Sequence, residues 1–325
     1  MPSPLIEELH RSLRLPVIGS PMFILSNPEL VLAQCINGVM GAFPALNARP
    51  AEQLEQWLQA IDDGLMTWRT AYPDRPVAPY AVNQIIHASN DRLEQDLDTC
   101  ARHRVPYIIT SLRAPQQVVG AVHGWGGRVL HDVTTVRHAE KALEAGVDGL
   151  ILVCAGAGGH AGTLSPFALV EEVRRFYDGP LVLAGAIATG RGILAAQAMG
   201  ADLVYMGTRF IAAQESNADP AYKQMVVQSH ASDILYTPTF TGIPGNYLAP
   251  SIVAAGMDPA SLPPPAEAGA VFGSGRSKAW RDIWGAGQGV GSTDAVEPTR
   301  LIVERLEAEY RAARQSLDRL PAPSP

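Results

Sequence analysis

The sequence predicts an α/β fold, a (β/α)8 TIM barrel with a smaller irregular second domain or lid before a C-terminal helix. Between about residues 15 and 210, eight short apolar runs alternate with longer segments that carry apolar residues at helical spacing. The runs are apolar on both faces, which is typical of parallel strands covered by helices. Eight repeats favour a closed barrel; the alternative is a doubly wound sheet, but no GxGxxG motif follows the first run.

Each predicted strand is an apolar run bounded by glycine, proline or polar residues. In chain order the runs are LPVIG (15–19), GVMGAF (38–43), VAPYAVN (77–83), PYIIT (106–110), RVLHDV (128–133), GLILVC (149–154), PLVLAG (180–185) and LVYMG (203–207). Segments such as 92–103 and 135–146 lie between them and are predicted helices. In the first of these, Leu93 and Leu97 are four residues apart and therefore share one face.

The best-marked helix follows residue 160. Ser165 is a favourable N-cap, and Pro166 suits the first turn because its missing N–H would have no partner there. The predicted apolar stripe of this helix consists of Leu169, Val170, Val173, Phe176 and Tyr177. A shorter helix is predicted over 189–199, with Gly200 placed to end it.

The composition changes near residue 231, where segments such as TPTFTGIPGNYLAPS (237–251) are rich in proline and glycine. We therefore predict a barrel over 1–230, a small lid or substrate domain over 231–295, and a C-terminal helix with a disordered tail over 296–325. The final helix has an apolar face made of Val303, Leu306, Tyr310, Ala313 and Leu317, and we expect it to pack on the barrel. Glu307 and Arg311 are spaced for an ion pair across one turn.

Charge and cysteine usage narrow the functional classes. The net charge of −7 argues against broad electrostatic binding to nucleic acid or to an anionic membrane. Cys35, Cys100 and Cys154 are scattered without a CxxC spacing, so neither a metal site nor a disulfide framework is expected. The start of the chain lacks a basic segment followed by an apolar core, and we expect a cytoplasmic protein. The sequence leaves open whether the chain forms a homo-oligomer.

Active sites of (β/α)8 barrels lie at the C-terminal ends of the strands, so the residues that follow each strand are the candidates. These residues are Ser20, Pro21, Met22, Asn83, His131, Asp132, the loop CAGAGGHAG (154–162), Gly185, Ala186, Gly207 and Thr208. The last four follow strands seven and eight, where loops of such barrels often bind phosphate through backbone N–H groups. The alternative interpretation is that these glycines only permit tight turns.

His160 is the one titratable residue in the glycine- and alanine-rich loop 154–162. It could be a loop residue that makes local hydrogen bonds only. We favour a role as a general base or polar anchor at the barrel mouth, because an ordinary histidine pKa near 6.5 suits proton transfer. His87, just after the third strand, is a weaker second candidate.

Four motifs resemble those of the nitronate monooxygenase family, formerly called 2-nitropropane dioxygenases. They are PVIGSPM (16–22), AGGHAG (157–162), LAGAIATGRGILAAQAMGADLVYMGTRF (183–210) and KAWRDIWGAGQGVG (278–291). The motif AGGHAG alone also resembles flavin-dependent enoyl-acyl-carrier-protein reductases, which have a similar fold. The resemblance implies FMN as the cofactor, held in a barrel that carries a small second domain.

The resemblance also implies roles for individual residues. The flavin ring would be lined by Ser20, Pro21, Met22 and Phe23, with Asn83 on its polar edge. The phosphate would be held by Gly185, Ala186, Gly207 and Thr208. The catalytic residue would be His160, beside Gly159, and Gln288 would approach the flavin from the small domain.

Two residues depart from the family pattern. Asp132 stands where many relatives have a lysine near the flavin pyrimidine, so we expect either that His131 compensates or that Asp132 turns away. Ala186 replaces a common second glycine, and we expect it to leave a backbone N–H for phosphate.

The leading hypothesis from this resemblance is FMN-dependent oxidation of an alkyl nitronate, or of a nitroalkane, by O2 to a carbonyl compound and nitrite, with a small-molecule substrate and O2 as the partners. A second hypothesis is an NAD(P)H-dependent FMN reductase of a quinone or an enoyl thioester. The third is a barrel without catalytic activity that serves as a binding protein.

Overall fold

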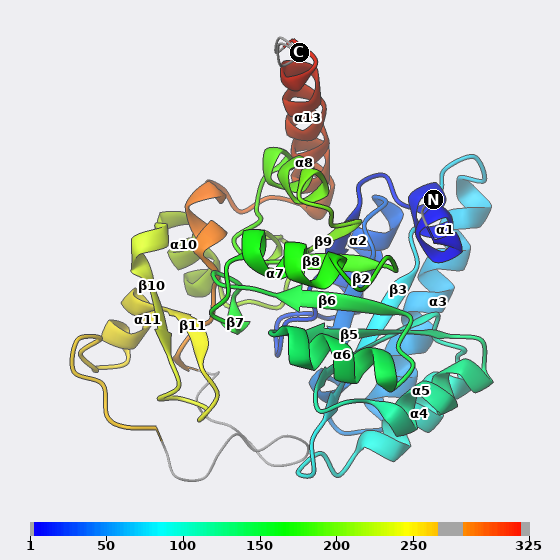
Figure 1. The fold of residues 1–325 in the computed structure, drawn as a ribbon, viewed down its shortest axis with the longest axis horizontal. Coiled ribbons are helices and arrows are strands. Elements are labelled where there is room, and N and C mark those ends of the chain that lie inside the picture. The colour runs from blue at the N-terminus through cyan, green and yellow to red at the C-terminus, as the bar shows by residue number, and fades with distance from the viewer. Residues whose placement is uncertain (1–2, 266–281, 320–325) are drawn as a thin grey trace.

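The computed structural model describes residues 3–265 and 282–319, and eight parallel strands form its main sheet (Figure 1). They are β1 (Val17–Gly19), β2 (Gly41–Pro44), β3 (Tyr80–Ile86), β4 (Tyr107–Leu112), β5 (Arg128–Val133), β6 (Gly149–Val153), β8 (Leu181–Ala184) and β9 (Leu203–Met206). Their order is β1-β9-β8-β6-β5-β4-β3-β2, and a parallel bridge between Ile18 and Met40 brings the two ends of the sheet together. The predicted barrel is therefore confirmed, and each predicted apolar run overlaps one strand.

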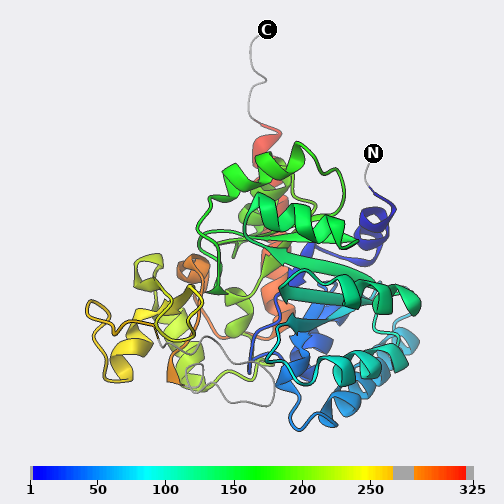
Figure 2. The same cartoon turned by 60° about the horizontal axis from the view of Figure 1, so that its bottom comes forward.

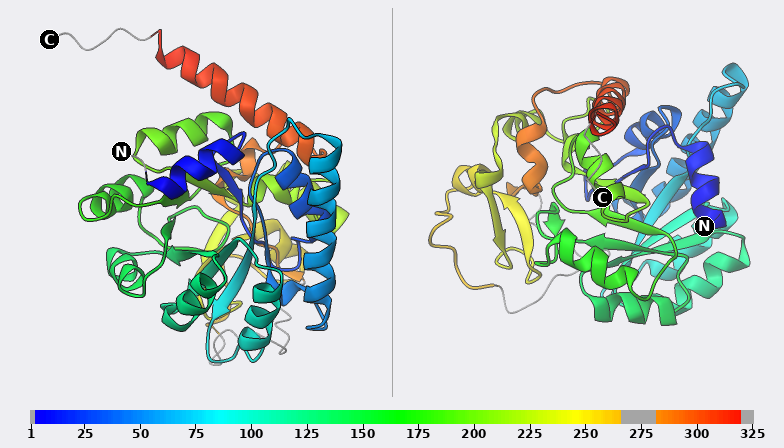
Figure 3. Two further views of the ribbon diagram at one scale, coloured as in Figure 1. Left: turned by 90° about the vertical axis from the view of Figure 1, so that its right-hand side faces the viewer. Right: turned by 45° about the horizontal axis from the view of Figure 1, so that its top comes forward.

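Helices surround the barrel on its outer side (Figure 3). They are α2 (Pro28–Ile36), α3 (Gln53–Ala71), α4 (Leu93–Arg102), α5 (Gln116–Gly124), α6 (Val136–Glu144), α7 (Pro166–Arg174), α8 (Gly190–Ala198), α9 (Thr208–Ile211) and α13 (Thr299–Leu317), with the 3-10 turn η1 (Ala45–Asn47) after β2. A further helix, α1 (Pro4–Ser12), buries Ile6 and Leu9 against the inner side chains of the barrel. These inner side chains include Tyr107 and Leu203 at the starts of β4 and β9, so α1 covers the N-terminal end of the barrel.

A small antiparallel sheet stands beside the C-terminal end of the barrel (Figures 1 and 2). Its strands are β10 (Ile234–Thr237), β11 (Gly245–Leu248) and β7 (Gly159–His160), in the order β10-β11-β7. Around it lie α10 (Pro220–Gln228), η2 (Ala231–Asp233), α11 (Ala249–Ala254) and η3 (Gln288–Ser292). Because β7 belongs to the loop after β6, this sheet joins the predicted lid to the barrel through the strand that carries His160.

The predicted helices are largely confirmed. α8 begins after Thr189, whose side chain accepts a hydrogen bond from the N–H of Gly192. The predicted stripe of α7 is wrong at Phe176, which is 45% exposed because the helix already ends at Arg174. The predicted face of α13 is wrong at Leu317, which is exposed in the last turn, where the helix projects beyond the barrel (Figure 3).

The C-terminal helix α13 packs on α8, as predicted. A Cβ on Gly190 would lie 2.1 Å from the carbonyl oxygen of Leu306, so glycine permits this close approach. The hydroxyl of Tyr310 donates to Gln197 at 2.6 Å, and Glu307 and Arg311 form the predicted ion pair at 2.6 Å.

The tail 320–325 and residues 278–281 of the late motif lie outside the described residues. The domain limits stay a prediction. No helix in the described ranges is long and apolar enough to cross a bilayer.

Candidate active site

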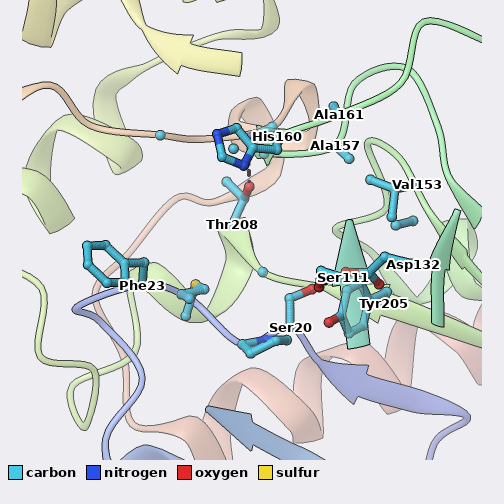
Figure 4. Close-up of a pocket in the computed structure, with 18 of the residues that line it drawn as sticks. Ser20, Phe23, Ser111, Asp132, Val153, Ala157, His160, Ala161, Tyr205 and Thr208 are labelled. Atoms are coloured by element: carbon cyan, nitrogen blue, oxygen red, sulfur yellow. Dashed lines mark hydrogen bonds between the residues drawn. The ribbon is translucent and has the colours of Figure 1, made fainter. Parts of the chain in front are cut away.

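A cavity of about 720 Å³ lies at the C-terminal ends of the barrel strands (Figure 4), a size typical of cofactor and ligand pockets. Its lining includes twelve of the predicted site residues: Ser20, Pro21, Met22, Phe23, Asn83, Asp132, Gly159, His160, Gly185, Ala186, Gly207 and Thr208. Gln288 is different, since its side chain is exposed and only its neighbours Gly287 and Gly289 border the cavity. Its backbone N–H instead donates to the carbonyl of Gly156 at 2.9 Å. His87 is not part of the lining either, and bonds to Ser89.

The floor of the cavity is the uppermost layer of side chains inside the barrel. Side chains alternate along a strand, so residues two positions beyond a buried inner residue also point inward. The inner residues Ala81, Ile109, Leu130 and Leu203 belong to one buried cluster. Two positions further along their strands stand Asn83, Ser111, Asp132 and Tyr205, all of which line the cavity. We did not predict Ser111 and Tyr205, although the same alternation identifies them.

Three floor residues form a chain of hydrogen bonds across adjacent strands. The side-chain N–H of Asn83 donates to the Ser111 hydroxyl at 2.9 Å, and this hydroxyl donates to Oδ2 of Asp132 at 2.7 Å. Burial raises the pKa of Asp132 to about 7, and the bond from Ser111 offsets only part of that effect. The carboxyl group is therefore divided between its acid and its carboxylate near neutral pH.

The structure contradicts both of the expectations for Asp132. The residue does not turn away, because it points inward and lines the cavity. His131 does not compensate either, since it faces the helices and bonds to Thr110 at 2.8 Å. Burial lowers the pKa of His131 to about 4, so this imidazole carries no charge at neutral pH.

The roof of the cavity carries His160. The strand β7 pairs with β11, with His160 opposite Gly245, and the side-chain N–H of Asn246 donates to the carbonyl of Ala157 at 2.6 Å. The Nε2 atom of His160 lies 3.0 Å from the hydroxyl of Thr241. That hydroxyl can donate its own proton to the carbonyl of Ile243 at 3.0 Å and accept one from Nε2; in this tautomer Nδ1 is the basic nitrogen.

Burial lowers the pKa of His160 to about 4. Our expectation of an ordinary pKa near 6.5 is therefore wrong, because the roof removes the imidazole from bulk water. The ring is neutral across the physiological range. A neutral imidazole can accept a proton there, although it is a weaker base than a solvent-exposed histidine.

The loops after β8 and β9 form one end of the cavity. Gly185 has φ of +144°, and a Cβ there would lie 2.8 Å from the carbonyl oxygen of Ala155, so glycine is required. Ala186 has φ of +53°, and its N–H donates to Gly156 at 3.3 Å rather than pointing at the cavity, contrary to our expectation. Thr208 opens α9, and its hydroxyl accepts from the N–H of Gly287 at 2.8 Å while keeping its own proton to donate.

The entrance to the cavity is apolar. Ile24, Leu112 and Leu164 are exposed large side chains that border it. Ile24 and Leu112 have φ of +60° and +79°, a conformation that is strained for such residues and that often marks functional sites. The guanidinium of Arg49 lies 5.7 Å from the centre of the Phe23 ring. An apolar entrance above a polar floor suits a ligand with a polar end and an apolar body.

Comparisons with known proteins agree with this architecture. The family model described as nitronate monooxygenase matches residues 9–263. A nitronate monooxygenase of Paraburkholderia phytofirmans is 27% identical, with 81% of each chain covered. The (3aS,4S,5R,7aS)-5-hydroxy-7a-methyl-1-oxo-octahydro-1H-indene-4-carboxyl-CoA dehydrogenase of Rhodococcus jostii is 26% identical over 73% of this chain and 64% of its own length. The structure of FabK from Thermotoga maritima superposes with a TM-score of 0.76 at 23% identity, covering 98% of this chain and 99% of that one.

Proposed function

The chain belongs to the nitronate monooxygenase family, and we propose that it catalyses the FMN-dependent oxidation of alkyl nitronates, and of the nitroalkanes from which they form, by O2 to a carbonyl compound and nitrite. The family consists of oxidoreductases that are generally flavin-dependent; FMN as the flavin and a nitronate as the substrate are our proposal. The observation that carries it is the position of His160, a desolvated neutral imidazole that lines the same cavity as the predicted ring-binding and phosphate-binding residues.

The residues present fit FMN. The first turn of α9 offers backbone N–H groups and the Thr208 hydroxyl to a phosphate, next to the tight turn at Gly185. Met22 and Phe23 line an apolar wall that suits an aromatic ring. The floor offers, to the polar edge of that ring, polar atoms that have no partner in the part of the chain that the structure describes. When bound, FMN would supply the redox chemistry by taking electrons from the substrate and passing them to O2.

The residues of the chain would position the substrate and handle its proton. In the tautomer whose Nε2 donates to Thr241, Nδ1 is the atom that would accept the α-proton of a neutral nitroalkane. The resulting imidazolium would then stabilise the negative nitro oxygens. The sheet β10-β11-β7 would exclude water from this side of the cavity, which strengthens the interaction between the two charges.

The test is an anaerobic titration of the FMN-loaded protein, followed through its visible absorption. We expect ethyl nitronate alone to bleach the flavin bands, and admission of air to restore them with formation of nitrite. NADPH added in place of the nitronate should leave the bands unchanged. Failure to take up FMN, or flavin bands that do not respond to nitronate, would contradict the proposal.

A second candidate function is NAD(P)H-dependent reduction of an enoyl thioester or a quinone. Two observations favour it. One is the similarity to the Rhodococcus jostii protein, whose name describes a CoA ester as its substrate. The other is the apolar entrance formed by Ile24, Leu112 and Leu164. The same titration separates the two functions, since bleaching by NADH or NADPH and not by nitronate would select the reductase.

A further inference from the structure

Two polar atoms on the cavity floor have no hydrogen-bond partner among the described residues. They are Oδ1 of Asp132 and the hydroxyl oxygen of Tyr205, and each atom is buried. Buried polar groups are almost always satisfied in folded proteins, so an unpartnered pair in one cavity indicates a ligand that completes their hydrogen bonds.

These two atoms belong to strands on different sides of the barrel. Asp132 stands on β5 and Tyr205 on β9, and both side chains reach the same part of the floor beside Ser111 (Figure 4). Burial, followed by the charge of the Asp132 carboxylate, raises the pKa of Tyr205 well above its usual value. Tyr205 therefore keeps its proton at neutral pH. Its hydroxyl can donate a hydrogen bond to a ligand or accept one from it.

No cation among the described residues forms an ion pair with Asp132. In this part of the chain, its one side-chain hydrogen bond comes from Ser111 on β4. The neighbouring strand β6 contributes the apolar Val153. The other titratable groups that border the cavity are Arg49 after η1, His138 on α6, His160 on β7, Tyr222 on α10 and Tyr236 on β10.

Ser111 already donates to Oδ2, so a proton on this carboxyl group would reside on Oδ1, the atom that has no partner. The raised pKa of Asp132, about 7, is consistent with an acid form that is well populated at neutral pH. Tyrosine and a protonated aspartic acid in an apolar site are a known way of stabilising an oxyanion without a cation.

We propose that Asp132, as a carboxylic acid, and Tyr205 form a pair of hydrogen-bond donors to the pyrimidine edge of a bound flavin, where negative charge gathers on reduction. This inference rests on the proposed function, because it takes a flavin as the ligand. The floor is the polar part of a cavity with apolar walls, and the pyrimidine edge is the polar edge of the flavin ring. Both donors are neutral, and Asp132 has no ion pair among the described residues, so the stabilisation of reduced flavin would depend on one titratable proton.

The experiment measures FMN binding and the reduction potential of bound FMN between pH 5.5 and 8.5. FMN fluorescence quenching gives the dissociation constant of the apoprotein, and equilibration with a reference dye gives the potential. We expect the affinity of wild-type protein for FMN to fall by about tenfold as Asp132 ionises. The potential should fall more steeply with pH above 7 than below it, because the carboxylate opposes the anionic ring.

Matched variants identify the group responsible. Asp132→Asn keeps a neutral donor of the same shape, and we expect it to bind FMN tightly at pH 8.5 and to lose the change of slope near pH 7. Tyr205→Phe should weaken FMN binding about fivefold at every pH and keep that change of slope. Thr110→Val, which removes a buried hydroxyl on the outer side of β4, should behave as wild type. Asp132→Asn can fail to fold; the infrared C=O band of a protonated carboxyl in wild-type protein, lost on titration through pH 7, then tests the same point.

Each result decides between specific claims. Tight FMN binding with no pH dependence in the wild-type protein, or a change of slope that persists in Asp132→Asn, would overturn the donor pair and leave the proposed function standing. No binding of FMN by the wild-type protein at any pH would overturn both.

Discussion

The floor and the roof of the cavity are built in different ways. The floor residues Asn83, Ser111, Asp132 and Tyr205 are inward positions of barrel strands, fixed by the alternation along each strand and by the hydrogen bonds between strands. The roof residue His160 lies on a two-residue strand and bonds to Thr241, 81 positions later in the chain. Local periodicity therefore sets the floor, whereas the roof depends on docking of the small sheet.

The two regions also shift the pKa values of their titratable groups in opposite directions: the pKa of Asp132 is raised from its ordinary value and that of His160 is lowered. Burial without a cation raises the pKa of Asp132 to about 7, and burial of His160 lowers its pKa to about 4. Both groups are driven toward their uncharged forms. The cavity thus presents a neutral base above and a neutral acid below, which suits a planar ligand whose charge appears only during the reaction.

The largest expected effect is at the roof. His160→Asn should lower kcat/KM for nitroethane by about 10² to 10⁴, because it removes the group that accepts the proton. FMN affinity should change little, since the floor and the loops after β8 and β9 are intact. Steady-state nitrite formation and FMN binding measure the two effects separately. His87→Gln is the control, as His87 lies outside the cavity lining. Full activity in His160→Asn would contradict the assignment.

Docking of the small sheet should matter through Thr241. Thr241→Val removes the acceptor of the Nε2 proton, and we expect kcat for nitroethane to fall about tenfold with little change in KM, because the imidazole loses its orientation and its preferred tautomer. Thr241→Ser should restore most of the activity, whereas Thr239→Val, which removes a nearby hydroxyl outside the cavity lining, should have no effect. Equal losses in the valine and serine variants would show that the hydroxyl is not responsible.

Stability should depend on pH with opposite signs in the two regions. The folded pKa of Asp132 is above its unfolded value, so its contribution to the free energy of unfolding falls as pH rises from about 4 to 7. The folded pKa of His160 is below its unfolded value, so its contribution rises between about pH 4 and 6.5.

Urea unfolding of the apoprotein at pH 4.5 and pH 8 tests these signs. At pH 8, the free energy of unfolding of Asp132→Asn should exceed that of the wild-type protein by about 2 kcal/mol, a value that includes a reduction for water in the cavity. At pH 4.5 the two proteins should be nearly equally stable. His160→Asn should gain stability relative to wild type on going from pH 8 to pH 4.5. A common pH dependence in both variants would show that the two groups do not titrate as described.

The smallest effect is expected at the turn after β8, which contains Gly185 and Ala186. Ala186→Gly relieves a left-handed conformation at φ of +53°, but it also gives the unfolded chain more freedom, so the free energy of unfolding should change by less than about 1 kcal/mol. Unfolding in urea at pH 7 measures the change. Gly185→Ala is the contrasting variant, because its Cβ would lie 2.8 Å from the carbonyl oxygen of Ala155 and should cost more. A large loss of stability in Ala186→Gly would contradict this account of the turn.

The sequence predicts the floor of the cavity better than the roof, because alternation along a strand is local and docking of the small sheet is not. Eight apolar runs predicted the barrel, and most of the residues predicted to close the strands line the cavity, because parallel strands bring their C-terminal ends together. Ser111 and Tyr205 were missed although their inward positions follow from Ile109 and Leu203 two residues earlier. Thr241 could not be found, since its contact with His160 spans 81 residues and no local pattern encodes it. The lowered pKa of His160 could not be predicted for the same reason: it arises from burial under a sheet whose docking is a long-range event.

A crystal structure with bound FMN tests the central claim most directly. The account predicts the phosphate at the first turn of α9, the ring between the floor and His160, and its pyrimidine edge within hydrogen-bond distance of Oδ1 of Asp132 and the Tyr205 hydroxyl. A ring bound outside this cavity, or one whose pyrimidine edge points away from Asp132 and Tyr205, would contradict it.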